Sequence, residues 1–324
     1  MKKVVVIGGG TGNFTVLRGM KLHQVELSAI VSMADDGGSS GVLRDELGVL
    51  PPGDVRQCLV ALSESGRLMR SLMNYRFENG CLHGHSVGNI FLSALEKVTG
   101  SFETAVEEVG KILNIKGKVI PVTTNKVRLH LVLENKKVLL GESEILLYKN
   151  SLVGFNSIYL EPFPKANPRA IEAIMNADVI IFGPGGIYTS LIPNLLVEGV
   201  SKALRETEAK KIFVVNLMNK KIQTPGFKVS NYLNEVKRFI GKDIFDHIIV
   251  NNGIPPKKLM SNYADESELI ENDLMDDSRV VTANLLEEEV PQYNKNDVIA
   301  HTRALIRHDA RKLADELMKI VDNV

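Results

Sequence analysis

Short aliphatic runs without polar alternation recur along the chain, and glycine-rich turns follow several of them. Five runs have this pattern: Val4–Ile7, Leu27–Met33, Ala177–Phe182, Lys211–Leu217 and Ile244–Val250. Such runs are typical of parallel strands that are buried on both faces. The first two enclose a helical segment, which predicts a right-handed βαβ unit. The pattern therefore predicts an α/β fold with a doubly wound, mainly parallel sheet.

Apolar residues at helical spacing lie between these runs. Asp54 is a good helix cap, and it precedes one such segment. The predicted helices cover Phe14–Met20, Asp54–Leu62, Leu68–Tyr75, Val87–Val98, Thr104–Leu113, 191–204, Tyr232–Ile240 and Val298–Val321.

Residues 114–162 have a different pattern. Val127, Leu129 and Leu131 alternate with polar residues, and Asn135–Lys136 has the composition of a turn. Alternation of this kind predicts an antiparallel hairpin with one solvated face. We expect a small α+β insertion within one domain that spans residues 1–324.

The region near the C-terminus is strongly acidic. Between residues 261 and 290 the chain carries ten acidic side chains and one basic side chain, Arg279. We interpret residues 261–297 as a solvated, mobile and variable segment. Residues 298–324 are then expected to form a closing helix.

Composition narrows the classes of function. The chain has 39 basic and 39 acidic residues, which argues against a nucleic-acid-binding surface. Its two cysteines fit a reducing compartment rather than a disulfide framework. No apolar stretch approaches the roughly 20 residues that span a bilayer. We expect a soluble, cytoplasmic protein without integral membrane association, and the sequence leaves a homodimer open.

The first glycine-rich turn carries candidate chemistry. Gly8, Gly9, Gly10, Thr11, Gly12 and Asn13 stand between the first strand and its helix. Backbone N–H groups in such a turn can bind a phosphate at the positive end of the helix. Asn13 occupies the position where the dinucleotide fingerprint requires glycine, which weakens an NAD interpretation. A tight turn without a ligand is the alternative.

Two carboxylates follow the second strand, at the edge of the sheet where ligands bind in such folds. We favour Asp36 for a functional role and Asp35 for a turn. Gly37, Gly38, Ser39 and Arg44 follow as further ligand contacts. Asp36 and Asp54 together are predicted to hold a magnesium ion. In an enzyme they would also be the catalytic carboxylates.

Two further segments complete the candidate site. His85 and Asn89 are four residues apart at the start of a helix and are predicted to face a ligand. Zinc is disfavoured there, because no second ligand pair occurs at the spacing of a structural site. The second glycine-rich turn supplies Gly183, Gly185, Tyr188, Thr189 and Ser190.

These motifs, in this order, resemble those of the CofD-like proteins, and most of all the bacterial gluconeogenesis factor (YvcK-type) branch. The resemblance covers residues 1–255 and resumes at Ile306–Asp309. It implies a Rossmann-like three-layer α/β/α sandwich. The chain departs from that branch at three positions. The branch usually has a basic residue where Val42 stands, Asn where Gln57 stands and Ser where Gly186 stands.

The resemblance implies two different functions. The regulatory branch binds a UDP-sugar and is associated with gluconeogenic growth, cell shape and cell-wall precursor supply. Its tyrosine matches Tyr263, and its Arg-His motif matches Arg307 and His308. The other branch contains magnesium-dependent 2-phospho-L-lactate transferases that use a donor linked to a nucleotide diphosphate. Arg307 and His308 favour the regulatory branch, with a nucleotide-sugar as ligand. A scaffold with a vestigial pocket, working through the acidic residues 265–289, is a third possibility.

Overall fold

The computed structural model describes residues 1–148, 150, 152–261, 267–288 and 305–324. Seven parallel strands form its large sheet, in the order β12-β10-β8-β7-β1-β2-β3. Their bounds are β1 Lys2–Gly8, β2 Val25–Val31, β3 Lys118–Pro121, β7 Val179–Phe182, β8 Lys210–Val214, β10 His247–Asn251 and β12 Val280–Ala283. The predicted parallel sheet is confirmed.

The strand order reverses next to β1. The chain proceeds from β1 through β2 to β3 in one direction, and from β7 through β8 and β10 to β12 in the other. In open α/β sheets such a switch point leaves a crevice at the carboxyl ends of the two strands. Here that crevice lies beyond Gly8 and Phe182.

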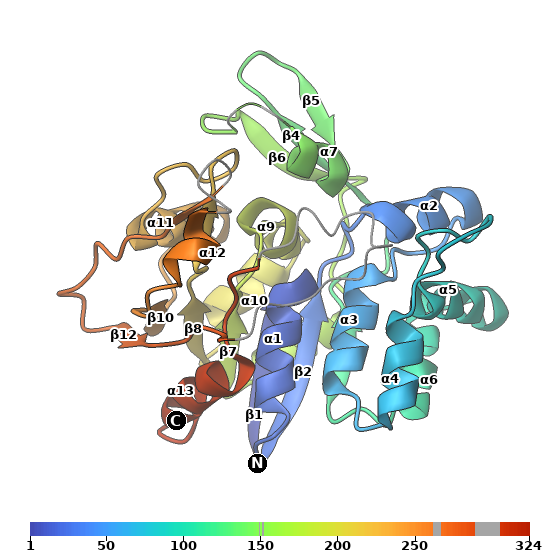
Figure 1. Ribbon diagram of the computed structural model, residues 1–324, viewed down its shortest axis with the longest axis horizontal. Coiled ribbons are helices and arrows are strands. Elements are labelled where there is room, and N and C mark those ends of the chain that lie inside the picture. Colours follow the sequence, from blue (N-terminus) through green and yellow to red (C-terminus); the bar gives the residue numbers. More distant parts are fainter. Residues whose placement is uncertain (149, 151, 262–266, 289–304) are drawn as a thin grey trace.

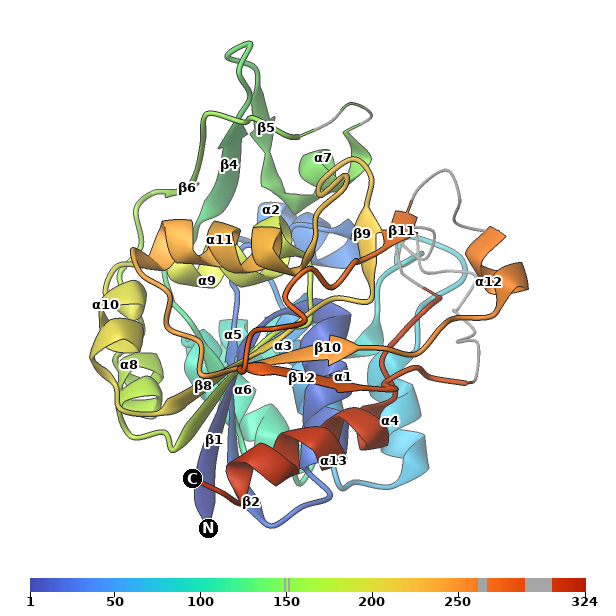
Figure 2. The same ribbon diagram turned by 90° about the vertical axis from the view of Figure 1, so that its left-hand side faces the viewer.

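Helices cover both faces of the large sheet. On one face α1, α3 and α13 pack together, and α8 and α10 lie on the other (Figure 2). The helices are α1 Gly10–Met20, α2 Gly38–Leu47, α3 Gly53–Leu62, α4 Arg67–Asn74, α5 Val87–Thr99, α6 Phe102–Ile112, α8 Pro168–Met175, α10 Val200–Glu206, α11 Val229–Ile240, α12 Lys257–Ser261 and α13 Ala310–Val321. The expected three-layer sandwich is therefore present.

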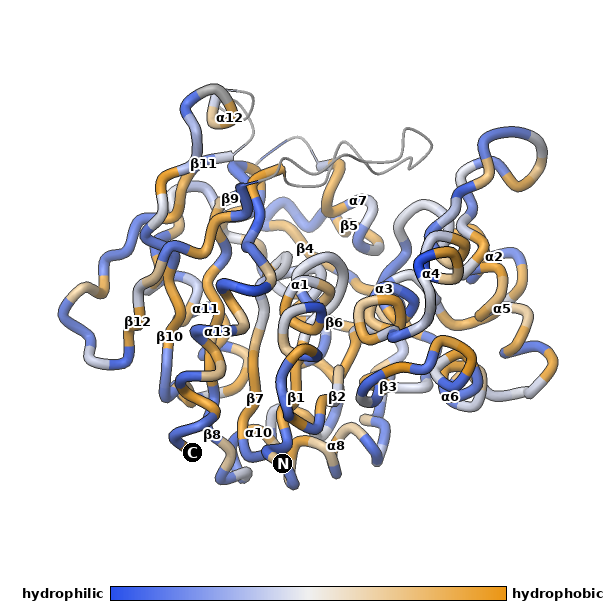
Figure 3. The backbone as a smooth tube through the Cα atoms, turned by 60° about the horizontal axis from the view of Figure 1, so that its bottom comes forward, coloured by the Kyte–Doolittle hydropathy of each residue, from blue (hydrophilic) through white to orange (hydrophobic). Residues whose placement is uncertain are grey.

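The core lies between these layers. The side chains of Val4–Ile7 in β1 and of Val179–Phe182 in β7 are almost completely buried. Both strands are coloured hydrophobic in Figure 3. Complete burial explains why neither strand alternates between polar and apolar residues. Among the described residues, no helix has the length and apolar character needed to cross a membrane.

A three-stranded antiparallel sheet stands beyond the carboxyl ends of the parallel strands (Figure 1). It consists of β4 Arg128–Val132, β5 Val138–Leu140 and β6 Ser157–Glu161, and α7 Gly141–Leu147 follows β5. The predicted hairpin is confirmed, and β6 adds a strand that the sequence analysis did not identify. Since β3 pairs with β2 in the large sheet, the small sheet begins later than residue 114.

The acidic region is more ordered than predicted. β12 within it forms an edge of the large sheet, next to β10. A second segment, β11 Ser267–Leu269, pairs with β9 Met218–Lys220. Backbone pairing to existing strands thus outweighs the high negative charge in residues 267–288. The other parts of the predicted acidic segment, 262–266 and 289–297, lie outside the described residues.

The closing helix is shorter than the predicted Val298–Val321. α13 begins at Ala310, because the Asp309 side chain accepts hydrogen bonds from the backbone N–H groups of Arg311 and Lys312. This is the usual geometry of an N-cap. Residues 305–309 precede the helix, and 298–304 lie outside the described residues.

Candidate functional site

Two glycine loops meet at the switch point of the sheet. The loop after β1 contains Gly9, the N-cap of α1, and continues through the first turn of that helix to Gly12. A Cβ atom on Gly12 would overlap the carbonyl oxygen of Pro184, in the loop after β7. Only glycine permits this backbone approach. The loops therefore form one continuous surface, with the N-terminus of an 11-residue helix exposed in it.

The second loop is held by Asn216, which follows β8. Its Oδ1 accepts a hydrogen bond from Gly185 N at 2.8 Å, and its Nδ2 donates to Gly185 O at 2.8 Å. The loop leads into η1 Ile187–Leu191, a single π-helical turn, and α9 Ile192–Leu195. This turn presents Thr189 and Ser190 on the same side as the glycines.

The loops line a cavity of about 760 Å³, within the usual size range of ligand sites. Fourteen of the predicted site residues line it, namely Gly9, Gly10, Thr11, Gly12, Gly37, Gly38, Ser39, Asp54, Asn89, Gly185, Thr189, Ser190, Arg307 and His308. Seven others lie outside its lining: Gly8, Asn13, Asp36, Arg44, His85, Gly183 and Tyr188. Tyr263 lies outside the described residues.

Tyr188 was predicted to contact the ligand, but it faces the protein interior. Its ring packs edge to face on Phe155, with the ring centroids 5.1 Å apart. Burial, followed by the negative charge of Glu235 in α11 and a hydrogen bond to it, raises the pKa of the tyrosine hydroxyl. Burial likewise raises the pKa of Glu235. Tyr188 thus joins η1 to α11.

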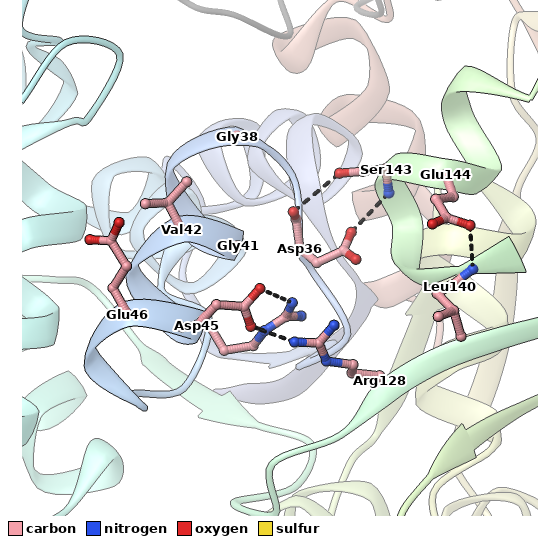
Figure 4. A pocket seen from close by; sticks show the side chains of 11 residues that line it. Asp36, Gly38, Gly41, Val42, Asp45, Glu46, Arg128, Leu140, Ser143 and Glu144 are labelled. Atoms are coloured by element: carbon pink, nitrogen blue, oxygen red, sulfur yellow. Dashed lines mark hydrogen bonds and ion pairs between the residues drawn. The ribbon is translucent and has the colours of Figure 1, made fainter.

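Asp36 also lies away from the cavity. One of its carboxylate oxygens accepts a hydrogen bond from Ser143 N at 2.8 Å, and the hydroxyl of Ser143 donates to Asp36 O at 3.1 Å (Figure 4). Burial raises the pKa of Asp36. It lines a separate outer groove with Arg44, which bonds to Asp45. Asp36 therefore fastens α7 to the loop before α2, whereas Asp54, its predicted partner, lines the cavity.

Asp35, rather than the predicted Asp36, lines the cavity. Its side chain turns back to accept a hydrogen bond from Gly37 N at 2.9 Å, and it packs against the Cα of Gly53. The next residue, Asp54, directs its carboxylate to Gly9. Both carboxylates line the cavity.

A third carboxylate comes from the small sheet. Glu142 in α7 is partly buried and lines the cavity. Burial raises its pKa well above the ordinary value, and the negative charges of Asp35 and Asp54 raise it further. A hydrogen bond with Thr189 opposes this shift. These effects together favour the protonated form of Glu142.

The residues present fit magnesium only in part. In the described part of the chain, no three His, Cys, Asp or Glu side chains are arranged to hold a metal ion. Magnesium, however, often binds through one or two carboxylates together with substrate phosphates. Asp35 and Asp54, beside the glycine loop, have the chemistry that such a shared site requires.

The start of α5 contributes Asn89 to the cavity, but not His85. Ser86 caps the helix by accepting a hydrogen bond from Asn89 N at 3.2 Å. The Asn89 amide donates to Ser39 Oγ at 3.2 Å, and His85 Nδ1 lies 3.0 Å from the same oxygen. His85 thus supports Ser39 from outside the lining.

Arg307 and His308 reach the cavity from the segment before α13, rather than from the helix itself. The backbone is fixed there by a hydrogen bond from Glu287 N to Arg307 O, 2.9 Å long. His308 is buried, and desolvation lowers its pKa to about 4. It is therefore neutral at physiological pH, and the fixed positive charge of this segment belongs to Arg307.

Known proteins with the same sequence pattern identify the family. A family model described as 2-phospho-L-lactate transferase CofD matches residues 4–291. The gluconeogenesis factor of Bacillus subtilis is 37% identical over 321 residues, which cover 98% of each chain. That of Halalkalibacterium halodurans is 42% identical over 267 residues, 82% of each chain. This chain belongs to the CofD family, in its gluconeogenesis factor branch.

A solved structure agrees with this family assignment. The crystal structure of a UPF0052 family member from Bacillus halodurans matches with a TM-score of 0.88 and 37% sequence identity. The match covers 98% of this chain and 100% of the other.

In this gluconeogenesis factor family member, several cavity residues escaped the sequence analysis. Asn216 follows a buried strand at its carboxyl end, a position that could have been recognised. Nothing in the sequence near Glu142 indicated a cavity residue, because its position depends on how the small sheet and α7 pack against the rest of the protein. Arg56 and Arg76 line the cavity as well.

Proposed function

We propose that this protein is a regulatory protein that binds a nucleotide-sugar, with a UDP-sugar as the preferred ligand. It would act in the cytoplasm and link carbon metabolism to cell shape and cell-wall precursor supply. One observation carries the proposal: two glycine loops join at the switch point and share a cavity with Arg307. Backbone N–H groups and a fixed guanidinium are the partners that a diphosphate requires.

The proposed ligand lies with its diphosphate across the two glycine loops. The N-terminus of α1 and the loop held by Asn216 donate hydrogen bonds to it, and Arg307 balances its charge. The raised pKa of Glu142 reduces the negative charge that this side chain brings near the phosphates. Calorimetric titration with UDP-sugars and with guanine nucleotides tests the proposal, and the absence of binding by all of them would refute it.

A magnesium-dependent transferase of the 2-phospho-L-lactate type is the second candidate. It is favoured by the CofD family match and by the two carboxylates beside the glycine loop. Magnesium held by Asp35 and Asp54 would stabilise the charge that develops on the phosphate oxygens. One of these carboxylates would also orient the attacking hydroxyl group.

The transferase activity is tested by magnesium-dependent release of UMP or GMP from nucleotide diphosphate-linked donors. Asp35→Asn should abolish release and leave nucleotide affinity within a few-fold. Asp36→Asn is the matched control, because that carboxylate contacts Ser143 rather than the cavity. If the wild type releases no nucleotide with any donor, the enzymatic candidate is excluded.

A further inference from the structure

We propose that His308 and Gln223 recognise the nucleobase of the bound nucleotide. His308 accepts a hydrogen bond from a ring N–H, and Gln223 donates one to the neighbouring carbonyl oxygen. Uracil carries this donor and acceptor side by side, at N3–H and O4. The inference rests on the proposed function, because it deepens the same site: it places the base end of the ligand and names the side chains that contact it.

His308 has one ring nitrogen without a partner. The residue is 6% exposed and lines the cavity. Its ring forms a hydrogen bond with the backbone of Val215, whose own N–H already donates to Ile249 O at 3.0 Å, so the ring donates to the Val215 carbonyl oxygen. In the part of the chain that the structure describes, the other nitrogen, Nε2, has no hydrogen-bond partner. Because burial keeps the ring neutral, Nε2 is an acceptor.

Gln223 supplies the complementary group. It is 4% exposed and lines the same cavity, and its Nε2 also lacks a hydrogen-bond partner among the described residues. The turn that carries it is fixed, because Gln223 N donates to Lys220 O at 2.9 Å. The next side chain, Thr224, accepts a hydrogen bond from Tyr232 at 3.1 Å. An amide N–H is a donor only. One donor and one acceptor of the cavity wall are thus left unpaired by the described residues.

The two unpaired groups favour a ligand that supplies both partners. Both Nε2 atoms are closed off from water, so solvent does not pair them. A buried polar group without a partner costs free energy, which a ligand that pairs it recovers. The ligand must displace the side chains that cover these atoms, and such changes of side-chain conformation are common on binding. A flat ring with an N–H beside a carbonyl group gains both hydrogen bonds at once.

The surroundings favour a base rather than a sugar at this end of the cavity. Three apolar side chains, those of Leu217, Ile222 and Ile306, line the cavity in the segments that carry the two unpaired groups. Apolar side chains pack on the faces of a flat ring, whereas sugar hydroxyls need polar partners. Ser39 and Ser40 in α2 line the cavity and supply such partners. In Figure 1, β8 and α2 lie on opposite sides of α1. The ligand therefore lies with its base toward β8 and its sugar toward α2.

The test compares UDP with N3-methyl-UDP, in which a methyl group replaces the ring N–H, by calorimetric titration of the full chain. We expect the wild type to bind UDP about tenfold more tightly or better. His308→Phe keeps a ring but removes the acceptor, so the preference for UDP should fall to about threefold or less. If the folded variant keeps the full preference, the methyl group is rejected for its size alone and the proposal is overturned. Equal affinity of the wild type for the two ligands would also overturn it.

His83→Phe is the matched control, because His83 is exposed and lies outside the cavity lining. It should keep the preference of the wild type.

Gln223→Met tests the donor, and it replaces His308→Phe if that variant does not fold, as judged by circular dichroism. It should weaken UDP binding roughly fivefold or more. Its free energy of unfolding should not fall, because the substitution removes a buried donor that has no partner in the described structure. Wild-type affinity for UDP in this variant would overturn the proposal.

Failure of the proposed function is distinguishable from failure of this inference. Pyrophosphate, which has no base, is the reference ligand for the glycine loops. If neither pyrophosphate nor UDP binds, the nucleotide-sugar proposal is refuted, and base recognition is refuted with it. If UDP binds without preference over its N3-methyl analogue, only base recognition by His308 and Gln223 is overturned.

Discussion

The Cα of Gly12 packs directly against the carbonyl oxygen of Pro184, so that any Cβ at position 12 would overlap this oxygen. The contact joins the loop after β1 to the loop after β7, the two strands at which the sheet order reverses. It makes one anion-binding surface from segments that are more than 170 residues apart in the sequence.

Gly12→Ala should therefore destabilise the protein and weaken nucleotide binding together. The overlap involves backbone atoms of both loops, so relief requires that one loop move. We expect a loss on the order of 2 to 4 kcal/mol in the free energy of unfolding, measured by urea titration. Gly66→Ala is the control, because a Cβ there would meet no atom within 4 Å. Equal stability of the two variants would contradict the loop contact.

Arg307→Ala should weaken UDP-sugar binding without unfolding the protein. A guanidinium that contacts a diphosphate forms charge-assisted hydrogen bonds, and their loss costs about 1.5 to 3 kcal/mol, or roughly tenfold or more in affinity. Calorimetry measures the change, and Arg311→Ala on the exposed side of α13 is the control. If affinity is unchanged, Arg307 has no role in binding.

Glu142→Gln should stabilise the protein in a pH-dependent manner. The folded state raises the pKa of Glu142 above its ordinary value of 4.5, so the stability that this group contributes is present below that pH and decreases as pH rises. The glutamine side chain does not ionise, so it makes no such pH-dependent contribution. The variant should be the more stable protein at pH 8, and the difference in unfolding free energy should decrease toward pH 4. A constant difference across this range would argue against a raised pKa of Glu142.

His308 should make the free energy of unfolding depend on pH in the opposite direction. Its pKa falls from 6.5 to about 4 on folding, so its contribution is complete above pH 6.5 and decreases as pH falls toward 4. The shift corresponds to about 3 kcal/mol, at about 1.4 kcal/mol per pKa unit. His308→Gln should show a correspondingly smaller loss of unfolding free energy between pH 7 and pH 4. Parallel curves for variant and wild type would show that His308 is not buried as a neutral group.

The parallel sheet and its glycine loops were predictable, because buried strands and glycine turns are encoded in short stretches of sequence. The choice between Asp35 and Asp36 was not, since both follow the same strand and share the same neighbours. Only the docking of Ser143, more than 100 residues later, turns Asp36 away from the cavity. Glu142 depends on the same docking event. By contrast, the start of α13 could be predicted from the sequence, because Asp309 is a good helix cap.

The central claim, a nucleotide-sugar site on the joined glycine loops, is tested most directly by calorimetric titration of the wild-type chain. The ligands are UDP-N-acetylglucosamine, other UDP-sugars, GDP and GTP, each with and without magnesium. At least one UDP-sugar should bind more tightly than the guanine nucleotides, with one ligand per chain. If none of these ligands binds the folded wild type, the joined glycine loops are not a nucleotide-sugar site.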